Sequence, residues 1–263
     1  MTATELNLAH GPNFRDLGGY RTEDNRVLRA HKLIRSARLD WLTPSDLDAL
    51  VAYGLRIDVD FRSPEERTAA PDPVPAGVTY AFLPVLPTDE TQASKAADQL
   101  RRSRFATDPQ GGFKNMVRLY REMPRHQSAQ KAYRDFFDLM LANDQAGQAL
   151  LFHCTAGKDR TGMGAVLALT ALGVPAATVR ADYLASNRFL AGKTREMLAA
   201  VSAKGGTSAL LASTKALASV DEAYLDAAIA TFNEDFGGLD NYLTNTLHVT
   251  PAQRQDLQRL YLA

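Results

Sequence analysis

Cys154 and Arg160 are separated by five residues, Thr-Ala-Gly-Lys-Asp, in a chain that contains no other cysteine. A thiolate is a strong nucleophile, and a guanidinium is a permanently charged, planar donor that can bind two phosphate oxygens at once. Five residues wrapped between a strand end and a helix start can also aim several backbone N–H groups at one anion. The spacing therefore predicts a phosphate-binding loop in which the Cys154 thiolate attacks phosphorus.

The flanking residues predict the strand and the helix that such a loop requires. Residues 150–152 are Leu-Leu-Phe, which is typical of a buried parallel strand. From Thr161 onward, small and apolar residues continue with helical character until Gly173 and Pro175. The loop is therefore expected at the end of a strand and at the positive end of a helix.

The loop residues have separate expected roles. Gly157 lets the backbone bend toward the ligand without a Cβ in the way. Thr161 can direct its hydroxyl at the sulfur and stabilise it as a leaving group, and His153 can hold the loop from outside by side-chain hydrogen bonds. The predicted phosphate-binding residues are Thr155, Ala156, Gly157, Lys158, Arg160 and Thr161.

Three stretches resemble one family. H-C-T-A-G-K-D-R-T-G at residues 153–162 resembles the catalytic loop of the protein tyrosine phosphatase superfamily. N-F-R-D-L-G-G-Y at 13–20 and D-Y-L-A-S-N at 182–187 are similar to two stretches of its bacterial branch, the mycobacterial tyrosine phosphatase B and Listeria type. The resemblance implies an α/β fold with a central, mostly parallel sheet flanked by helices. It also implies a phosphocysteine intermediate, no metal or other cofactor, and a possible helical lid over residues 191–236.

The resemblance favours Asp159, inside the loop, as the general acid, with Lys158 binding further phosphate charge or tuning that aspartate. Asp89 is a rival, because dual-specificity phosphatases carry their acid at a comparable place, after a strand and before a helix. A-G-K-x-R-T-G also resembles phosphoinositide 3-phosphatases, although Asp159 occupies a position that is glycine in those enzymes. The expected substrate is therefore a phosphoprotein or a phosphoinositide.

Other functions remain open from the residues alone. A single cysteine beside apolar residues is usually a buried core thiol, but its place in the ten-residue loop favours catalysis. A rhodanese-like sulfurtransferase also holds a cysteine among backbone amides, and a non-catalytic module could bind phosphate without turnover. Persulfide formation on Cys154 would indicate the first, and phosphate affinity without hydrolysis the second.

Composition limits the partners and the organisation. The chain has 263 residues, 45% of them hydrophobic, which fits one phosphatase domain over residues 1–263. Lys plus Arg and Asp plus Glu number 30 each, so no overall field favours nucleic acid. No 18-residue apolar run and no signal peptide are evident, which predicts no integral membrane association. We expect a cytoplasmic protein, or one secreted without a recognisable signal.

The rest of the chain predicts the elements around the loop. Strands are expected at residues 32–36, 55–61 and 78–83, the second half-buried because apolar and polar residues alternate in it. A helix should begin at the N-cap Thr43 and end near residue 54. Arg15 is expected to pair structurally with its neighbour Asp16, and a direct contact with the substrate is the alternative. The family resemblance places the R-S-P-E-E stretch at 62–66 beside the active-site sheet, where its charges are expected to steady the loop.

Overall fold

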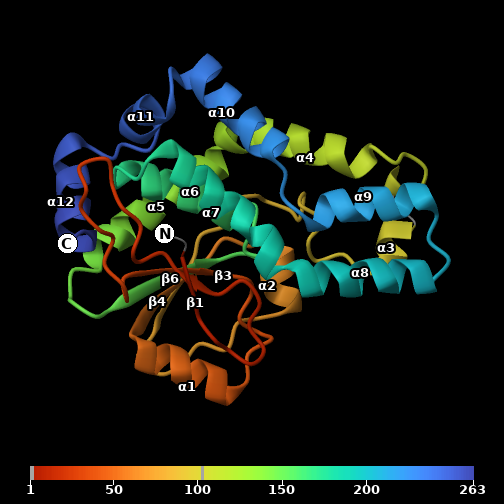
Figure 1. The fold of residues 1–263 in the computed structure, drawn as a ribbon, viewed down its shortest axis with the longest axis horizontal. Helices are drawn as coiled ribbons and strands as arrows, with labels where there is room; N and C mark the ends of the chain where they lie inside the picture. The colour runs from red at the N-terminus through yellow and green to blue at the C-terminus, as the bar shows by residue number, and fades with distance from the viewer. Residues whose placement is uncertain (1–2, 102–103) are drawn as a thin grey trace.

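The computed structural model of the protein describes residues 3–101 and 104–263. Within them, six strands form one mixed sheet (Figure 1). The strand order is β1 (Thr4–Glu5), β2 (Arg15–Asp16), β3 (Leu33–Ser36), β6 (Ala149–His153), β4 (Leu55–Asp60) and β5 (Thr79–Phe82).

The inner part of the sheet is parallel. β6 pairs in parallel with β3 on one side and with β4 on the other, and β4 pairs in parallel with β5. His153 lies opposite both Ser36 and Asp60, so the carboxyl ends of three strands meet at one edge. In open parallel sheets this edge is where ligands bind. The expected mostly parallel sheet flanked by helices is confirmed.

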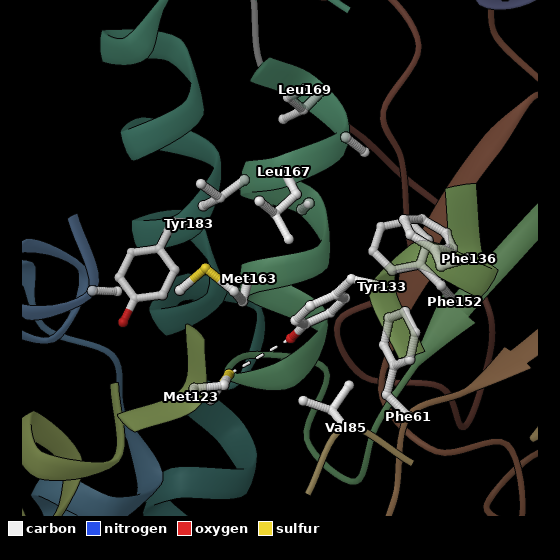
Figure 2. Packing of buried hydrophobic residues seen from close by; sticks show 14 of the residues in the cluster. Phe61, Val85, Met123, Tyr133, Phe136, Phe152, Met163, Leu167, Leu169 and Tyr183 are labelled. Atoms are coloured by element: carbon white, nitrogen blue, oxygen red, sulfur yellow. Dashed lines mark hydrogen bonds between the residues drawn. The ribbon is translucent and has the colours of Figure 1, made fainter. Parts of the chain in front are cut away.

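Alternation along β6 divides the core into two layers. Leu150 and Phe152 belong to the larger cluster, which α5 (Gln127–Ala142) and α6 (Arg160–Ala171) cover (Figure 2). Ala149 and Leu151 belong to the smaller cluster on the opposite face, beneath α1 (Pro44–Tyr53). A strand buried on both faces reads as a continuous apolar run, which is why β6 could be recognised from its sequence.

Local signals placed several elements correctly. β3 and β5 form where strands were expected. α1 begins at Thr43, whose side chain forms a capping box with Asp46, and it ends at Gly54, which has a left-handed conformation with φ 117°.

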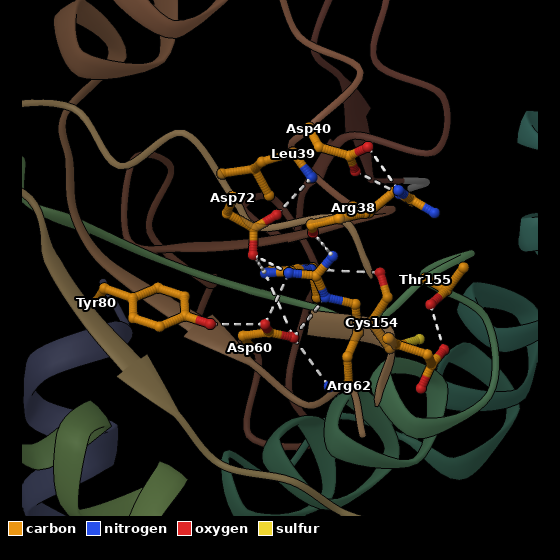
Figure 3. A network of polar contacts seen from close by, with 12 residues as sticks. Arg38, Leu39, Asp40, Asp60, Arg62, Asp72, Tyr80, Cys154 and Thr155 are labelled. Carbon is orange, nitrogen blue, oxygen red and sulfur yellow. Dashed lines mark hydrogen bonds and ion pairs between the residues drawn. The ribbon is translucent and has the colours of Figure 1, made fainter. Parts of the chain in front are cut away.

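The strand predicted at 55–61 forms as β4, but the prediction that it is half-buried was wrong. Asp58 and Asp60 of β4 are fully buried, although their polarity suggested a solvent-facing side. Arg62 contacts Asp60 (Figure 3). The His153 imidazole lies 3.4 Å from Asp58 Oδ1. These opposite charges compensate the carboxylates inside the protein.

The remaining helices surround the sheet and extend beyond it. α8 and α9 lie beside α3 and α4 and project past the sheet as an arm (Figure 1). In the described residues, no helix has both the length and the apolar composition needed to cross a bilayer. The other helices are α2 (Pro64–Ala69), α3 (Ala97–Arg101), η1 (Arg104–Ala106), α4 (Gly111–Glu122), η2 (Met123–Arg125), α7 (Ala176–Phe189), α8 (Ala191–Ala203), α9 (Ser208–Ala218), α10 (Glu222–Phe236), α11 (Leu239–Asn241), η3 (Tyr242–Thr246) and α12 (Pro251–Tyr261).

Candidate active site

The predicted phosphate loop lies at the carboxyl end of the central strand. β6 ends at His153, Cys154 follows at once, and α6 begins at Arg160. Gly157 adopts φ 68°, and a Cβ at this position would lie 2.1 Å from the Ser36 carbonyl oxygen. The loop therefore requires glycine both for its left-handed backbone and for its close approach to β3.

The loop presents a row of free backbone donors. None of the N–H groups of residues 155–160 donates to an acceptor within the described chain. Buried N–H groups are almost always paired in folded proteins, so consecutive free donors indicate a place for an anion. The positive end of α6 adds to this preference, because the first turn of a helix leaves its own N–H groups unsatisfied.

Arg160 is held by Glu66 of α2. Its Nη1 lies 2.5 Å from Glu66 Oε2 and its Nη2 lies 2.9 Å from Oε1, a bidentate pair in which both side chains are buried. Burial alone would raise the pKa of Glu66, but Arg160 lowers it to about 2. Arg160 Nε is buried and has no partner in the described structure, so it remains available for a phosphoryl oxygen.

Two loop hydroxyls complete this side of the site. Thr155 Oγ1 donates to Glu66, which links the loop to the same carboxylate that holds Arg160. Thr161 Oγ1 is buried and has no hydrogen-bond partner among the described residues. Its expected hydrogen bond to the sulfur stays a prediction.

Asp159 is buried in a polar pocket of its own. Lys158 Nζ lies 2.8 and 2.7 Å from its two carboxylate oxygens. The Tyr120 hydroxyl of α4 also donates to Asp159 Oδ1, at 2.9 Å. Asp159 is therefore held within the loop by one cation and one neutral donor, and does not depend on a separate loop for its position.

Asp89 is tied into its own turn. Its Oδ1 accepts from Thr91 Oγ1 at 2.7 Å and from the Ala93 N–H, and its Oδ2 accepts from the backbone and side chain of Ser94. Thr91 Oγ1 in turn accepts from Arg160 Nη2 at 3.3 Å. In this structure Asp89 therefore organises a loop that contacts Arg160, with its carboxylate oxygens already occupied.

Arg15 is buried, but it does not pair with Asp16 as the sequence suggested. Arg15 Nη1 lies 2.9 Å from Asp182 Oδ1, and Nη2 donates to Ser186 Oγ, both on α7. Asp16 instead accepts from the backbone N–H groups of Gly18 and His31. The side chains of neighbouring residues in a strand point to opposite faces of the sheet, so Arg15 and Asp16 cannot pair on one face.

His153 lies beneath the loop among three carboxylates, Asp58, Asp60 and Asp72. Burial alone would lower its pKa, but these carboxylates raise it to about 10. Burial raises the pKa of Asp58 to about 7, and Asp72 and Asp60 add to this effect.

The same cluster has residue types and a spacing that could hold a metal ion. Ligand atoms of Asp58, Asp72 and His153 lie within 4.8 Å of one another, close enough to share one. Arg62, however, already contacts both Asp72 and Asp60 (Figure 3). The positive charge that these carboxylates require therefore comes from the protein itself.

A cavity of about 490 Å³ opens beside the loop. It lies between the loop and helices α8 and α9, so a substrate that reaches Cys154 from this side passes under these helices. The residues that line it include Trp41, Lys95, Lys158, Lys193, Met197, Lys204 and Leu217.

The sequence did not predict individual roles for three residues of the site. Glu66 belongs to the R-S-P-E-E stretch that was expected to steady the loop, but its pattern signals only a helix start. Tyr120 lies among basic residues of α4 and carries no local signal. Asn13 was part of a family motif without a role, and its amide contacts the loop.

A buried thiol in a cradle of free amides, with an arginine six positions later, defines a cysteine-based phosphoryl-transfer site. The sequence profile of the tyrosine phosphatase family matches residues 6–263. A tyrosine-protein phosphatase of Cupriavidus necator is 36% identical over 253 residues, 95% of this chain and 86% of the relative. The chain therefore belongs to the tyrosine phosphatase family.

Two further similarities are more distant. The triple specificity protein phosphatase PtpB of Mycobacterium tuberculosis is 30% identical over 255 residues, 88% of this chain and 90% of the relative. A solved structure of P. aeruginosa TpbA aligns with a TM-score of 0.36 and 15% identity over 80% of this chain and 93% of that one. The resemblance inferred from the motifs is confirmed, and it favours a phosphatase over the sulfurtransferase and the non-catalytic module.

Proposed function

We propose that this phosphatase hydrolyses phosphotyrosine in two steps through Cys154. The thiolate attacks phosphorus in line, so that an S–P bond forms while the P–O bond to the tyrosine oxygen breaks. Asp159 gives its proton to that departing oxygen. Water then attacks the phosphocysteine, Asp159 takes one of its protons, and the S–P bond breaks to release inorganic phosphate.

One observation carries this proposal. Six consecutive backbone N–H groups beside the only thiol have no acceptor in the described chain, and the buried Nε of Arg160 is also unpartnered. A phosphoryl group carries three oxygens that can accept from these donors. Preorganised donors of this kind stabilise the charge that develops in the transition state, because they need not reorient during the reaction.

Arg160 owes its orientation to Glu66. The carboxylate occupies both terminal nitrogens of the guanidinium, at 2.5 and 2.9 Å. This pair fixes the plane of the guanidinium and leaves its Nε–H for the substrate. Glu66 is therefore proposed to position Arg160 without touching the phosphate.

The cavity supports substrates with more than one anionic group. Met197 and Leu217 supply apolar walls, and Lys95, Lys193 and Lys204 also line the cavity. Each of these lysines is paired with a carboxylate at the surface, and a phosphate group would compete for it. A phosphoinositide headgroup would place its reacting phosphate in the loop and further phosphates near these lysines. Phosphoinositides are therefore proposed as a second substrate class, and α8 with α9 as the lid that covers either substrate.

The test is phosphate release from an aryl phosphate, a phosphotyrosine peptide and phosphoinositides, with and without EDTA. We expect Cys154→Ser to abolish turnover while it still binds tungstate, because backbone atoms form most of the cradle. Hydrolysis by the wild type should survive EDTA. Substantial turnover by the serine variant, a strict need for added metal, or persulfide formation with thiosulfate in place of hydrolysis would contradict the mechanism.

A further inference from the structure

The side chain of Asn13 binds the outer side of the phosphate loop. This side chain is only 2% exposed, and its Nδ2 donates to the carbonyl oxygens of Ala156 and Gly157, at 3.0 Å each. Asn13 has φ 63°, a conformation that asparagine tolerates better than most residues. Its Oδ1 is buried without a partner in the described structure. The orientation of the amide is thus set by the two carbonyls, because a flipped amide would oppose oxygen to oxygen.

Arg35 of β3 holds the same segment from a second direction. Its Nη2 donates to the Gly157 carbonyl at 2.9 Å, and its Nη1 pairs with Asp182. Asp182 also binds Arg15, so the two outlying family motifs meet in one buried network behind the loop. None of these groups faces the cavity beside the loop.

The geometry of the peptide bond converts these contacts into an effect on the inner side. A trans peptide is planar, and its C=O and the following N–H point in opposite directions. Holding the Ala156 carbonyl outward therefore directs the Gly157 N–H inward. Holding the Gly157 carbonyl outward does the same for the Lys158 N–H. Both amides belong to the row of donors that has no acceptor in the described chain.

We propose that Asn13 is a positioning residue for the oxyanion cradle, which orients the Gly157 and Lys158 amides toward the phosphoryl oxygens with the help of Arg35. This inference rests on the proposed function, since it concerns how that cradle is built. Asn13 touches neither the substrate nor Cys154. It acts by preventing the two peptides from rotating, which would point carbonyl oxygens at the phosphate.

The test is Asn13→Asp, which keeps the shape of the side chain but replaces the donor by a carboxylate facing two carbonyl oxygens. Losing one oxyanion donor costs about 10²- to 10³-fold in turnover, so we expect kcat/KM for an aryl phosphate to fall by about 100-fold. Tungstate affinity, measured in a Cys154→Ser background, should fall as well. At lower pH the introduced carboxyl is protonated and can donate once, so the deficit relative to wild type should shrink.

Asn143→Asp is the matched control. Asn143 is also 2% exposed, donates its Nδ2 to a backbone carbonyl, that of Gln148, and has a buried Oδ1 without a partner in the described structure. We expect this variant to lose thermal stability without any change in tungstate affinity or in the pH profile of kcat/KM. Asn13→Gly, which accepts the positive φ, provides a second donor-free variant if the aspartate variant does not fold.

The outcomes separate the two levels of inference. If the wild type hydrolyses no phosphate ester, the proposed function fails. If the wild type is active and the folded Asn13 variants bind tungstate as tightly as the Asn143 control, the positioning role is wrong while the proposed function stands. A deficit in Asn13→Asp that does not vary with pH would equally contradict the orientation mechanism.

Discussion

The phosphate loop and helix α8, which is part of the proposed lid, are attached to the rest of the protein in different ways. Every residue of α6 except Thr170 is buried, and the loop before it is held by Glu66, Asn13, Arg35 and Tyr120. In α8 only Val201 is buried. Its ion pair between Lys193 and Glu196 lies at the surface, as does the pair of Asp98 with Lys204, the residue that follows the helix, whose side chains are 54% and 45% exposed.

This contrast separates the loop, whose geometry must be held rigidly, from helix α8, whose position can change. Charge-assisted hydrogen bonds inside the protein fix the reacting groups, because water cannot compete with them there. Surface pairs contribute little and are screened by salt. A rigid loop beside a loosely attached helix α8 fits the proposed lid, which would admit substrates of different sizes to one reacting site.

The largest expected effect concerns an acid inside the loop against one outside it. Removing a general acid costs about 10²- to 10⁴-fold, and the loss is greatest for a leaving group that needs a proton. We expect Asp159→Asn to lose much more activity on an alkyl phosphate than on an activated aryl phosphate. Asp89→Asn should lower the activity on all substrates slightly and to the same extent, since Asp89 holds the turn that contacts Arg160. If only Asp89→Asn showed a steep dependence on the leaving group, the general acid would be Asp89 and the assignment of Asp159 would be wrong.

The next effect tests the buried charges beneath the loop through pH. The pKa of His153 rises from its ordinary 6.5 to about 10 on folding, against the effect of burial, because Asp60, Asp72 and Asp58 surround it. Its contribution to stability is therefore complete below pH 6.5 and is lost as the pH rises through 10, on the order of a few kcal/mol. Urea unfolding across this range should show a decline that His153→Gln lacks.

Parallel pH dependence in the two proteins would contradict this assignment. If His153→Gln does not fold, the imidazole of His153 can be titrated by NMR in the wild type. A midpoint near the ordinary 6.5 would then show that the carboxylates do not hold the proton.

The smallest effect, a change in the free energy of unfolding, is expected at the end of helix α8 in the proposed lid. Lys204→Ala removes a surface pair with an N–O distance of 2.5 Å, and exposed pairs contribute about 0.2–1 kcal/mol. We expect a change in the free energy of unfolding at the lower end of that range, with kcat for a small aryl phosphate unaltered. Arg35→Ala, which leaves Asp182 buried with one partner fewer, should cost about 3–5 kcal/mol. Equal losses by calorimetry would remove the distinction between the two regions.

The sequence by itself determined the features that depend on neighbours along the chain. The Cys154-to-Arg160 spacing, the apolar run of β6 and the capping box at Thr43 each concern residues a few positions apart, where backbone geometry leaves few choices. These were sufficient to predict the loop, its strand and helix, and the family to which the chain belongs.

Only the tertiary structure decided which distant side chains support the loop. Glu66 meets Arg160 across 94 residues, and Asn13 meets Gly157 across 144. The same is true of Asp58 and Asp60, which alternate as solvent-facing residues would but are buried beside His153. Local patterns report the polarity of a position and the backbone conformation that it favours, whereas the partner of a buried charge depends on strand order and on which loops share an edge of the sheet.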